Sequence, residues 1–438
     1  LDEGLEPDTL IETFNLDIGL FNDKLVTGTL LNGRGTPFAV GQNAANELTD
    51  AGDLWAAGAI VEDLKNQFEE AVINGGAGNN TIVVNDLDRS ILVGGSRLSI
   101  INWRGDATLD NKGSDGLYPE HYLITLPVDS NATVDVRSTG TDSSDRLVVT
   151  GTDSADLYTL SGNGIATDSI GTIQSEVFSA MLVTHQGVEN VEIDSRAGDD
   201  RFAVNTIHTK VTLNTGFGSD VINVGTLAEI GELGQADTNE GGTLDSINAL
   251  LTTNGQGSGG DVMTLDDTGD NDVNHGTLTS TRITNGVAGT SFNLFGPGGS
   301  ITYSTLETLK IHLSTTTGNI FTIESTHGAG SVTLLTGGAD RDLINIETIA
   351  GDTTVQTGGG SDVVRVGNTT GHVGQVDGLL DAFDSNVNSI DARLTIDGGT
   401  GSADTLKVYD AGDNQRENVE LKSDELIGMG MTLGIGYS

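Results

Sequence analysis

Along much of this chain, apolar and polar residues alternate in short runs that glycine-rich turns separate. The alternation is clear in Val191–Asn205 and Val211–Val224, and it returns in Val332–Ile346 and Val355–Val366. Apolar residues at every second position are typical of strands with one buried face, because successive side chains point to opposite sides. Glycine and asparagine between the runs supply the backbone conformations of tight corners. The pattern therefore predicts an all-β chain of many short strands.

The turns repeat at a fixed spacing. Asp200 and Asp220 end equivalent turns 20 residues apart, and Asp342 and Asp362 do so again. Two or three short strands in each coil of about 20 residues are typical of a parallel β-helix, in which equivalent residues of successive coils stack. We expect Asp200 to lie over Asp220, and Asp342 over Asp362, at about one strand spacing.

A longer repeat encloses the short one. The segment Leu244–Asn271 matches Val387–Asn414, and Asp261 aligns with Asp404. Such self-similarity is typical of an array whose units stack and bury a core that no unit buries alone. It favours function through length, surface and assembly over function through a single pocket.

The array predicts four regions along the chain. They are an N-terminal cap or docking region (1–75), the first β-helical repeats (76–187), a repeat unit (188–304) and a second, incomplete unit (305–438). Two inserted segments, Thr226–Thr243 and Asn368–Asn386, stand at matching places and are expected to form loops or a short helix. Apolar residues within Ala57–Asn74 follow helical spacing, and Gly75 offers a stop. We expect one amphipathic helix there, which caps the core or docks another protein.

Composition restricts the partners. The 438 residues include 63 acidic and 20 basic side chains, a net charge of −43. This charge argues against nucleic-acid binding, which needs a basic surface, and it attracts divalent cations. No apolar run approaches the roughly 18 residues of a membrane-spanning helix, so no membrane insertion is expected. The chain has no cysteine and begins at Leu1, as if cut from a precursor. Sequons occur at Asn79, Asn131 and Asn368, as often as chance predicts.

Glycine-rich turns that end in aspartate occur throughout the repeats. They include RAGDD (Arg196–Asp200), GFGSD (Gly216–Asp220), GGADRD (Gly337–Asp342), GGGSD (Gly358–Asp362) and GGTGSAD (Gly398–Asp404). These turns resemble the GGxGxD calcium repeat of the RTX, or haemolysin-type, family and related β-helical repeats of large microbial surface proteins. The resemblance implies a parallel β-roll or β-helix outside the cell, with calcium held between turns by aspartate carboxylates and glycine carbonyls. The calcium ligands that it implies are Asp200, Asp220, Asp342, Asp362 and Asp404.

The same aspartates have a second interpretation. Each one can cap its turn by accepting hydrogen bonds from backbone N–H groups. Stacked carboxylates about 4.8 Å apart repel one another, which favours a bound cation. The motif occurs here about once in 20 residues, and Asn319 replaces aspartate in one copy. The sequence leaves both interpretations open.

Catalytic chemistry finds little support. Parallel β-helices often host polysaccharide lyases and hydrolases, which need clustered carboxylates, a basic residue and aromatic platforms. Carboxylates are abundant, as in Asp266–Asp272, so no pair stands out, and the seven histidines form no metal-binding pair. No Ser-His-Asp arrangement is defensible. We therefore expect no enzyme, and a polysaccharide-active β-helix is the less favoured alternative.

These patterns together predict an extracellular or cell-surface structural protein, a stiff rod, filament or adhesin stalk. A calcium-dependent RTX-like module is the alternative, and divalent cations or surface polysaccharide are further candidate partners. The chain closes with GIGYS (Gly434–Ser438), where the internal copies continue with another strand, and Leu10–Leu16 resembles that strand. We expect the N-terminal strand of one molecule to complete the C-terminal coil of the next, a head-to-tail self-association.

Overall fold

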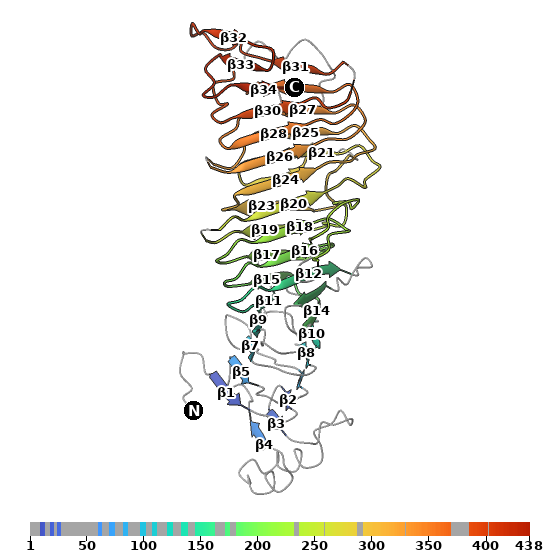
Figure 1. Ribbon diagram of the computed structural model, residues 1–438. Coiled ribbons are helices and arrows are strands. Elements are labelled where there is room, and N and C mark those ends of the chain that lie inside the picture. The colour runs from blue at the N-terminus through green and yellow to red at the C-terminus, as the bar shows by residue number, and fades with distance from the viewer. Residues whose placement is uncertain are drawn as a thin grey trace. The chain divides into compact units, whose positions relative to one another are not determined.

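The computed structural model contains only strands and loops in the residues that it describes (Figure 1). These are residues 145–162, 171–175, 181–231, 236–257, 259–286, 292–328, 330–368, 385–401 and 403–438, together with ten strands between residues 9 and 138. The prediction of an all-β chain is confirmed for this part. The chain divides into unit 1 (residues 1–198 and 209–214) and unit 2 (residues 199–208 and 215–438). Each unit has strands in two sheets, called A and B here.

Most strands of unit 1 pair in parallel. Sheet A has the order β1 (Thr9–Thr13), β5 (Glu70–Asn74), β7 (Arg97–Ile101), β9 (His121–Thr125), β11 (Arg146–Thr150), β15 (Asn190–Asp194) and β17 (Lys210–Asn214). The parallel strands of sheet B are β2 (Ile18–Phe21), β6 (Ile82–Asn85), β8 (Ala107–Asn111), β10 (Thr133–Ser138) and β14 (Met181–Gln186). The antiparallel additions are β3 (Lys24–Thr27), between β2 and β4 (Ile60–Asp63), and β13 (Gly171–Ser175), between β12 (Leu157–Gly162) and β14.

The amphipathic helix expected within Ala57–Asn74 is wrong, because strands β4 and β5 occupy this segment. Strand β5 pairs on both sides, with Ala71 opposite Leu10 of β1 and Leu98 of β7. Two neighbouring strands satisfy its backbone hydrogen bonds, and its valine and isoleucine suit a pleated sheet. Tertiary pairing therefore overrides the helical spacing of the apolar positions.

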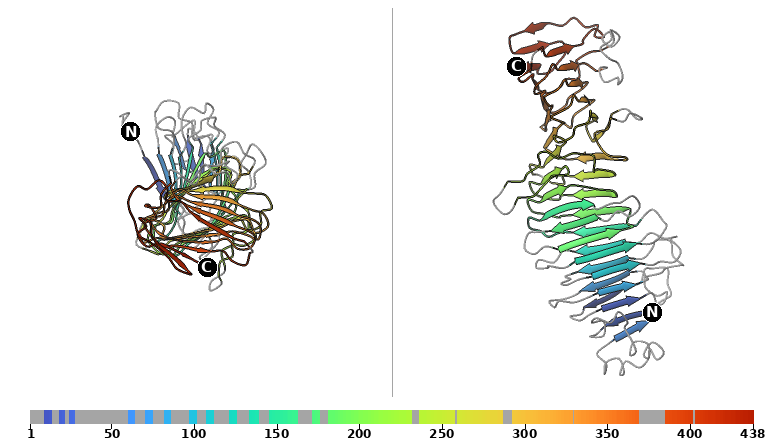
Figure 2. Two further views of the ribbon diagram at one scale, coloured as in Figure 1. Left: turned by 90° about the horizontal axis from the view of Figure 1, so that it is seen from above. Right: turned by 90° about the vertical axis from the view of Figure 1, so that its right-hand side faces the viewer.

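Unit 2 stacks its strands in successive layers, which Figures 1 and 2 show from three directions. Sheet A has the order β19 (Leu250–Asn254), β23 (Ser300–Ser304), β22 (Arg282–Asn285), β21 (His275–Leu278), β25 (Ile320–Ile323), β27 (Leu343–Ile346), β29 (Val363–Val366) and β31 (Thr405–Val408). Sheet B has the order β16 (Arg201–Val204), β18 (Val221–Val224), β20 (Val262–Asp266), β24 (Thr308–His312), β26 (Val332–Thr336), β28 (Asp352–Gln356), β30 (Leu394–Asp397), β34 (Ile435–Tyr437), β33 (Glu425–Gly428) and β32 (Val419–Leu421). Pairs that include β22 or β33 are antiparallel, and the others are parallel.

The predicted spacing of 20 residues is confirmed where no insertion intervenes. Arg201 lies opposite Val221 in sheet B, and Ile344 lies opposite Val364 in sheet A. In the described part of the inserted segment Thr226–Thr243, the chain forms a loop with no helix. Most of the other inserted segment, residues 369–384, lies outside the described residues.

Apolar side chains between the two sheets of unit 2 form the core. In one column of sheet B, Phe202, Ile222, Met263 and Leu309 follow one another on adjacent strands, and each is fully buried. Burial of one such side chain contributes about 1.5–3 kcal/mol. Each layer covers the apolar side chains of the layer before it, so the stability of a layer depends on its neighbours.

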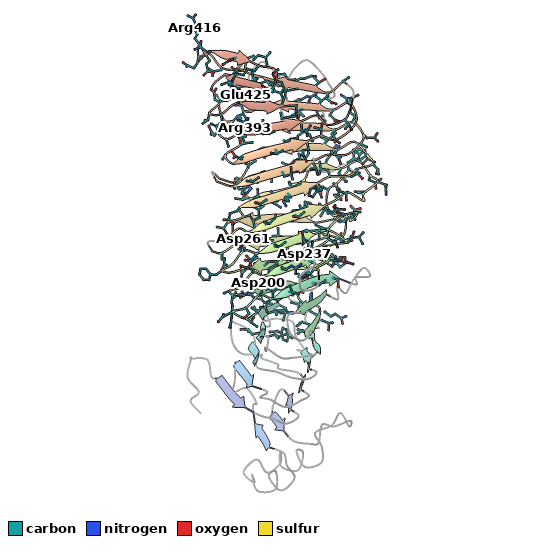
Figure 3. The ribbon with its side chains drawn as sticks, viewed as in Figure 1. Asp200, Asp237, Asp261, Arg393, Arg416 and Glu425 are labelled. Atoms are coloured by element: carbon teal, nitrogen blue, oxygen red, sulfur yellow. The ribbon has the colours of Figure 1, made fainter. Side chains whose placement is uncertain are left out.

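The open strand expected at the C-terminal GIGYS is also wrong. Strand β34 pairs with β30 on one side and with β33 on the other. An ion pair between Arg393 and Glu425, with 3.6 Å between Nη1 and Oε1, joins the β32–β33 hairpin to this end of sheet B (Figure 3). The open edge lies in sheet A instead, where β31 pairs only with β29 among the described strands.

Candidate functional site: stacked carboxylates at the glycine corners

The aspartates that end the glycine-rich turns form a ladder of hydrogen bonds in unit 2; Figure 3 labels Asp200 and Asp261. The backbone N–H of Asp200 donates to Oδ1 of Asp220 (2.8 Å), and the N–H of Asp220 donates to Oδ1 of Asp261 (3.0 Å). The N–H of Asp261 donates to Oε2 of Glu307 (2.8 Å). Each carboxylate therefore caps the backbone of the equivalent residue one layer earlier.

A second ladder repeats this geometry farther along the chain. The backbone N–H of Asn319 donates to Oδ1 of Asp342 (2.7 Å), and the N–H of Asp342 donates to Oδ1 of Asp362 (2.8 Å). The N–H of Asp362 donates to Oδ1 of Asp404 (3.0 Å). The structure thus brings together two of the predicted ligands, Asp200 and Asp220, in one ladder and the other three in the second.

Three ladder residues were not among the candidate residues from the sequence. Asp261 has a clear signal, because it aligns with Asp404 in the long repeat. Glu307 stands directly before a strand, as every ladder aspartate does, but its turn has no glycine. Asn319 keeps the position with an amide, whose Nδ2 donates to Oδ1 of Asp342 (2.9 Å). An acidic or amide residue immediately before a strand is the better signature.

The two ladders stand at different kinds of corner. Asp261 and Glu307 lie where the chain passes from sheet A to sheet B, from β19 to β20 and from β23 to β24. Asp342 lies where the chain passes from sheet B to sheet A, from β26 to β27. The repeat therefore returns with its two sheets exchanged. Among the hydrogen bonds described for unit 2, four carboxylates belong to the first stack and three to the second, and this division reduces the repulsion between like charges.

Glycine allows the corners to stack at this distance. Gly360 has a φ of 119°, which side chains rarely adopt. A Cβ on Gly259 would lie 1.4 Å from the carbonyl oxygen of Gly218 in the layer below. The glycines therefore serve both the turn and the close approach of neighbouring layers.

Burial perturbs the ladder carboxyls. Desolvation raises the pKa of Asp220, Asp342 and Asp362, against the lowering effect of the backbone N–H groups that they accept. Desolvation also raises the pKa of Asp261 to about 6. An acid with a raised pKa in the folded state binds its proton more tightly there than in the unfolded chain. These groups therefore favour the fold most at low pH, and the contribution of Asp261 is lost as the pH rises from about 4 to about 6.

The second oxygen of two ladder carboxyls is buried. Oδ2 of Asp220 and of Asp362 accepts no hydrogen bond of normal geometry. The hydroxyls of Thr215 and Thr357 nevertheless lie near enough to lower the pKa of the two groups. A buried carboxylate oxygen in this state favours a proton or a cation. Among the described residues, no three or more histidine, aspartate or glutamate side chains converge as metal ligands. The calcium ladder that the resemblance implies stays a prediction.

A separate group of carboxylates lies at the end of the first long repeat. Oδ1 of Asp267 accepts from the backbone N–H of Leu244 (2.9 Å), and Oδ2 accepts from Nδ2 of Asn274 (2.7 Å). The same amide donates to Oδ2 of Asp270 (2.7 Å). Burial, and after it the negative charges of Asp270 and Asp245, raises the pKa of Asp267 to about 8. The raised pKa favours the protonated form of Asp267, and the hydrogen bonds of the group hold a loop of the fold.

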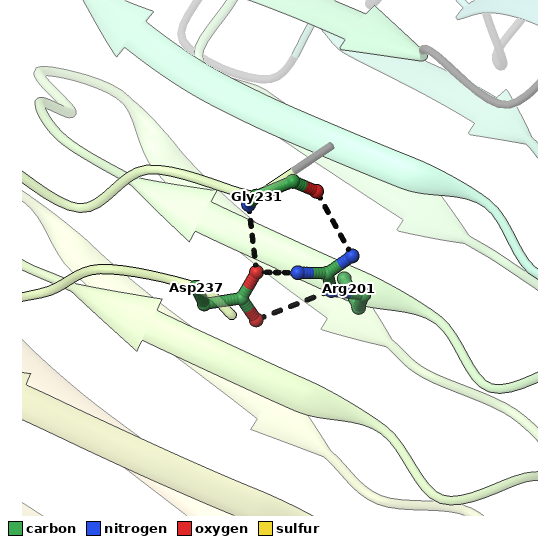
Figure 4. Close-up of polar contacts among 3 residues, drawn as sticks. All are labelled: Arg201, Gly231 and Asp237. Carbon is green, nitrogen blue, oxygen red and sulfur yellow. Dashed lines mark hydrogen bonds and ion pairs between the residues drawn. The ribbon is translucent and has the colours of Figure 1, made fainter. Parts of the chain in front are cut away.

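Arg201 fastens the inserted loop to sheet B (Figure 4). Its Nε donates to Oδ2 of Asp237 (3.2 Å), and its Nη2 pairs with Oδ1 of the same carboxylate. Its Nη1 donates to the carbonyl oxygen of Gly231 (3.1 Å), while the N–H of Gly231 donates to Asp237 (3.0 Å). A two-pronged pair of this kind is directional, so it holds the loop in one orientation.

Comparisons with models of protein families, with curated proteins and with solved structures find no match for this chain. Within the described residues, no helix is long and apolar enough to cross a membrane.

Proposed function

We propose that the chain is a structural repeat protein, a parallel β-helix with coils of about 20 residues that serves as a stiff rod, filament or adhesin stalk. The observation that supports this most is the pair of carboxylate ladders, in which each layer caps the backbone of the layer before it. The hydrogen bonds of these carboxylates serve the stacking of the layers. The role is mechanical, and no catalytic step is assigned.

Stiffness follows from three interactions that act along the same direction. Parallel backbone pairing, columns of buried apolar side chains and the ladders all join a layer to its neighbours. The net charge of −43 keeps separate rods apart in solution, and it favours divalent cations between them. The resemblance of the glycine-rich turns to the RTX calcium repeat supports a location outside the cell or on its surface.

Small-angle scattering and electron microscopy test the rod. At about 4.8 Å for each coil of about 20 residues, the particle is expected to extend on the order of 80–100 Å. A compact globular particle, with similar dimensions in all directions, would contradict the proposal.

Calcium binding is a second candidate function, and the buried Oδ2 atoms of Asp220 and Asp362 favour it. If calcium neutralises these oxygens, calcium should raise the melting temperature of the wild-type protein, and a chelator should reverse the rise. Asp220→Asn should abolish the rise. The matched control is Asp199→Asn at the exposed side of the neighbouring corner, which should keep it. No rise in the wild type at millimolar calcium rejects this candidate.

A further inference from the structure

Strand β31 of unit 2 has one edge with which no described strand pairs. Thr405 and Tyr409 donate their backbone N–H groups to carbonyl oxygens of Asp362 and Val366, on the side of β29 (2.8 and 2.9 Å). Successive residues of a strand direct their backbone groups to alternate sides. The N–H groups of Asp404, Leu406 and Val408 therefore face away from β29, where no described strand pairs with β31.

An apolar cavity opens beside this edge. It has a volume of about 510 Å³, and its lining includes Ile396, Leu406, Val408, Leu421, Leu426 and Tyr437. Leu406 and Val408 continue the columns of the buried Val364 and Val366, but they are only partly buried themselves. The layer that would cover them is missing from the described strands. Leu421, on the neighbouring hairpin, remains 74 % exposed.

The second ladder also ends at this place. Asp362 donates its N–H to the carboxylate of Asp404, which precedes β31 directly. By the rule of the ladder, the N–H of Asp404 is aimed at a carboxylate that precedes the next strand. The missing layer must therefore begin with an acidic residue, followed by a parallel strand with an apolar residue at its second position.

The chain contains this sequence at another edge. Asp8-Thr9-Leu10 repeats Asp404-Thr405-Leu406, and β1 starts at Thr9. Among the described strands β1 pairs only with β5, in parallel. We infer that β31 of one molecule accepts β1 of a second copy, with Asp8 as the next rung of the ladder and Leu10 over Leu406. This inference deepens the proposed rod, because it makes the rods join head to tail.

The register of this joint is fixed by the ladder. It sets Thr9 opposite Thr405, Leu10 opposite Leu406, and Glu12 opposite the partly exposed Val408. Parallel addition of a strand supplies backbone hydrogen bonds along the whole edge. A joint of this kind is heterologous, so it builds an open filament.

Two single-cysteine variants test the joint, since the chain has no cysteine of its own. Thr9→Cys and Thr405→Cys place one thiol on each strand, about 4.8 Å apart across the pair, which suits a disulfide. Mixing the variants under mild oxidation, at about 0.5 M salt to shorten the screening length to roughly 4 Å, should give the cross-linked heterodimer. The matched control is Thr9→Cys mixed with Val419→Cys, which is exposed on the edge strand β32.

The inference is overturned if the Thr9→Cys and Thr405→Cys pair cross-links no faster than the control, or if Thr405→Cys prefers its own copy. Sedimentation gives a second readout. Leu406→Asp puts a charge into the cavity and should weaken association at least tenfold, whereas Lys407→Asp, on the other face of β31, should weaken it much less. Equal effects of the two variants also overturn the inference. An elongated particle without the cross-link would leave the rod intact and reject only the joint.

Discussion

The two copies of the long repeat share their local hydrogen bonds but not their surroundings. The interior copy is Leu244–Asn271, and the terminal copy is Val387–Asn414. In each copy the ladder aspartate accepts an N–H at 3.0 Å, from Asp220 in the interior copy and from Asp362 in the terminal one. The bridges Ile207–Ile247 and Ile349–Ile390 correspond as well. The local sequence therefore determines the turn and its caps wherever the copy lies.

The surroundings differ because the sheets are exchanged and the stack ends. Leu265, in the interior copy, lies on β20 between β18 and β24, and it is fully buried. The equivalent Val408 lies on β31, which has one neighbour, and it is only partly buried. The same apolar position thus stabilises the fold to different degrees. The number of neighbouring layers, and not the residue type alone, sets its contribution.

The acidic groups show the same difference more sharply. Three residues after the end of the interior copy, Asn274 donates to two carboxylates, and Glu417 stands at the same place after the terminal copy. The pKa of Glu417 is raised by desolvation and by the charges of Asp413 and Asp410. A third carboxylate is tolerated there because Glu417 is partly exposed to water. After the interior copy an amide stands at this position.

The largest expected effect contrasts the two apolar positions. Leu265→Asp buries an unpaired charge between layers, and it should lower the free energy of unfolding by about 4 kcal/mol or more. Val408→Asp should cost about 1 kcal/mol, because water reaches the side chain. Urea unfolding of both variants, followed by circular dichroism, measures the difference. Equal losses in dilute, monomeric protein would show that the same chain covers the end of unit 2, and they would contradict the open edge.

An exchange of residues between the acidic groups gives the next largest effect. Asn274→Glu removes two hydrogen bonds and adds a charge beside Asp267 and Asp270, so it should destabilise the fold by about 3 kcal/mol. Glu417→Asn should be neutral or slightly stabilising, since it removes repulsion at a partly exposed place. Thermal unfolding of the two variants at pH 7 checks both signs. A stable Asn274→Glu variant would mean that a cation enters the group.

Much of the fold followed from the sequence because strand pairing leaves periodic signals. The 20-residue spacing predicted the stacking of Asp200 on Asp220, and the register and hydrogen bond confirm it. The direction of each cap was not predictable. An aspartate that caps its own turn and one that caps the turn in the layer below have the same local sequence. Only the fold distinguishes the two cases.

Two expectations failed for lack of long-range information. The apolar positions of Glu70–Asn74 fit a helix or a strand, and the choice was made by β1 and β7, which are distant in sequence. The exposed edge was expected at Tyr437, but the β32–β33 hairpin folds back and pairs with that strand. The exchange of the two sheets left no local signal, because each turn looks the same at either corner.

A dependence of stability on pH separates Asp267 from Asp410. Burial raises the pKa of Asp267 to about 8, whereas the pKa of Asp410 is raised by a weaker desolvation at a partly exposed place. Because the folded pKa is the higher one, the contribution of Asp267 to stability is greatest at low pH. It falls as the pH rises from about 4 to about 8, at most by about 1.4 kcal/mol for each unit from one group.

Asp267→Asn removes this titration while Asn keeps an oxygen for the N–H of Leu244. Relative to the wild type, the variant should gain stability steadily between pH 5 and pH 8, and Asp410→Asn should gain much less. Melting temperatures at four or five pH values in this interval measure both slopes. Parallel curves for the wild type and Asp267→Asn would show that Asp267 stays ionised in the fold. The interior copy would then hold its charge by an attraction that its described neighbours do not supply, and a bound cation would be the natural source.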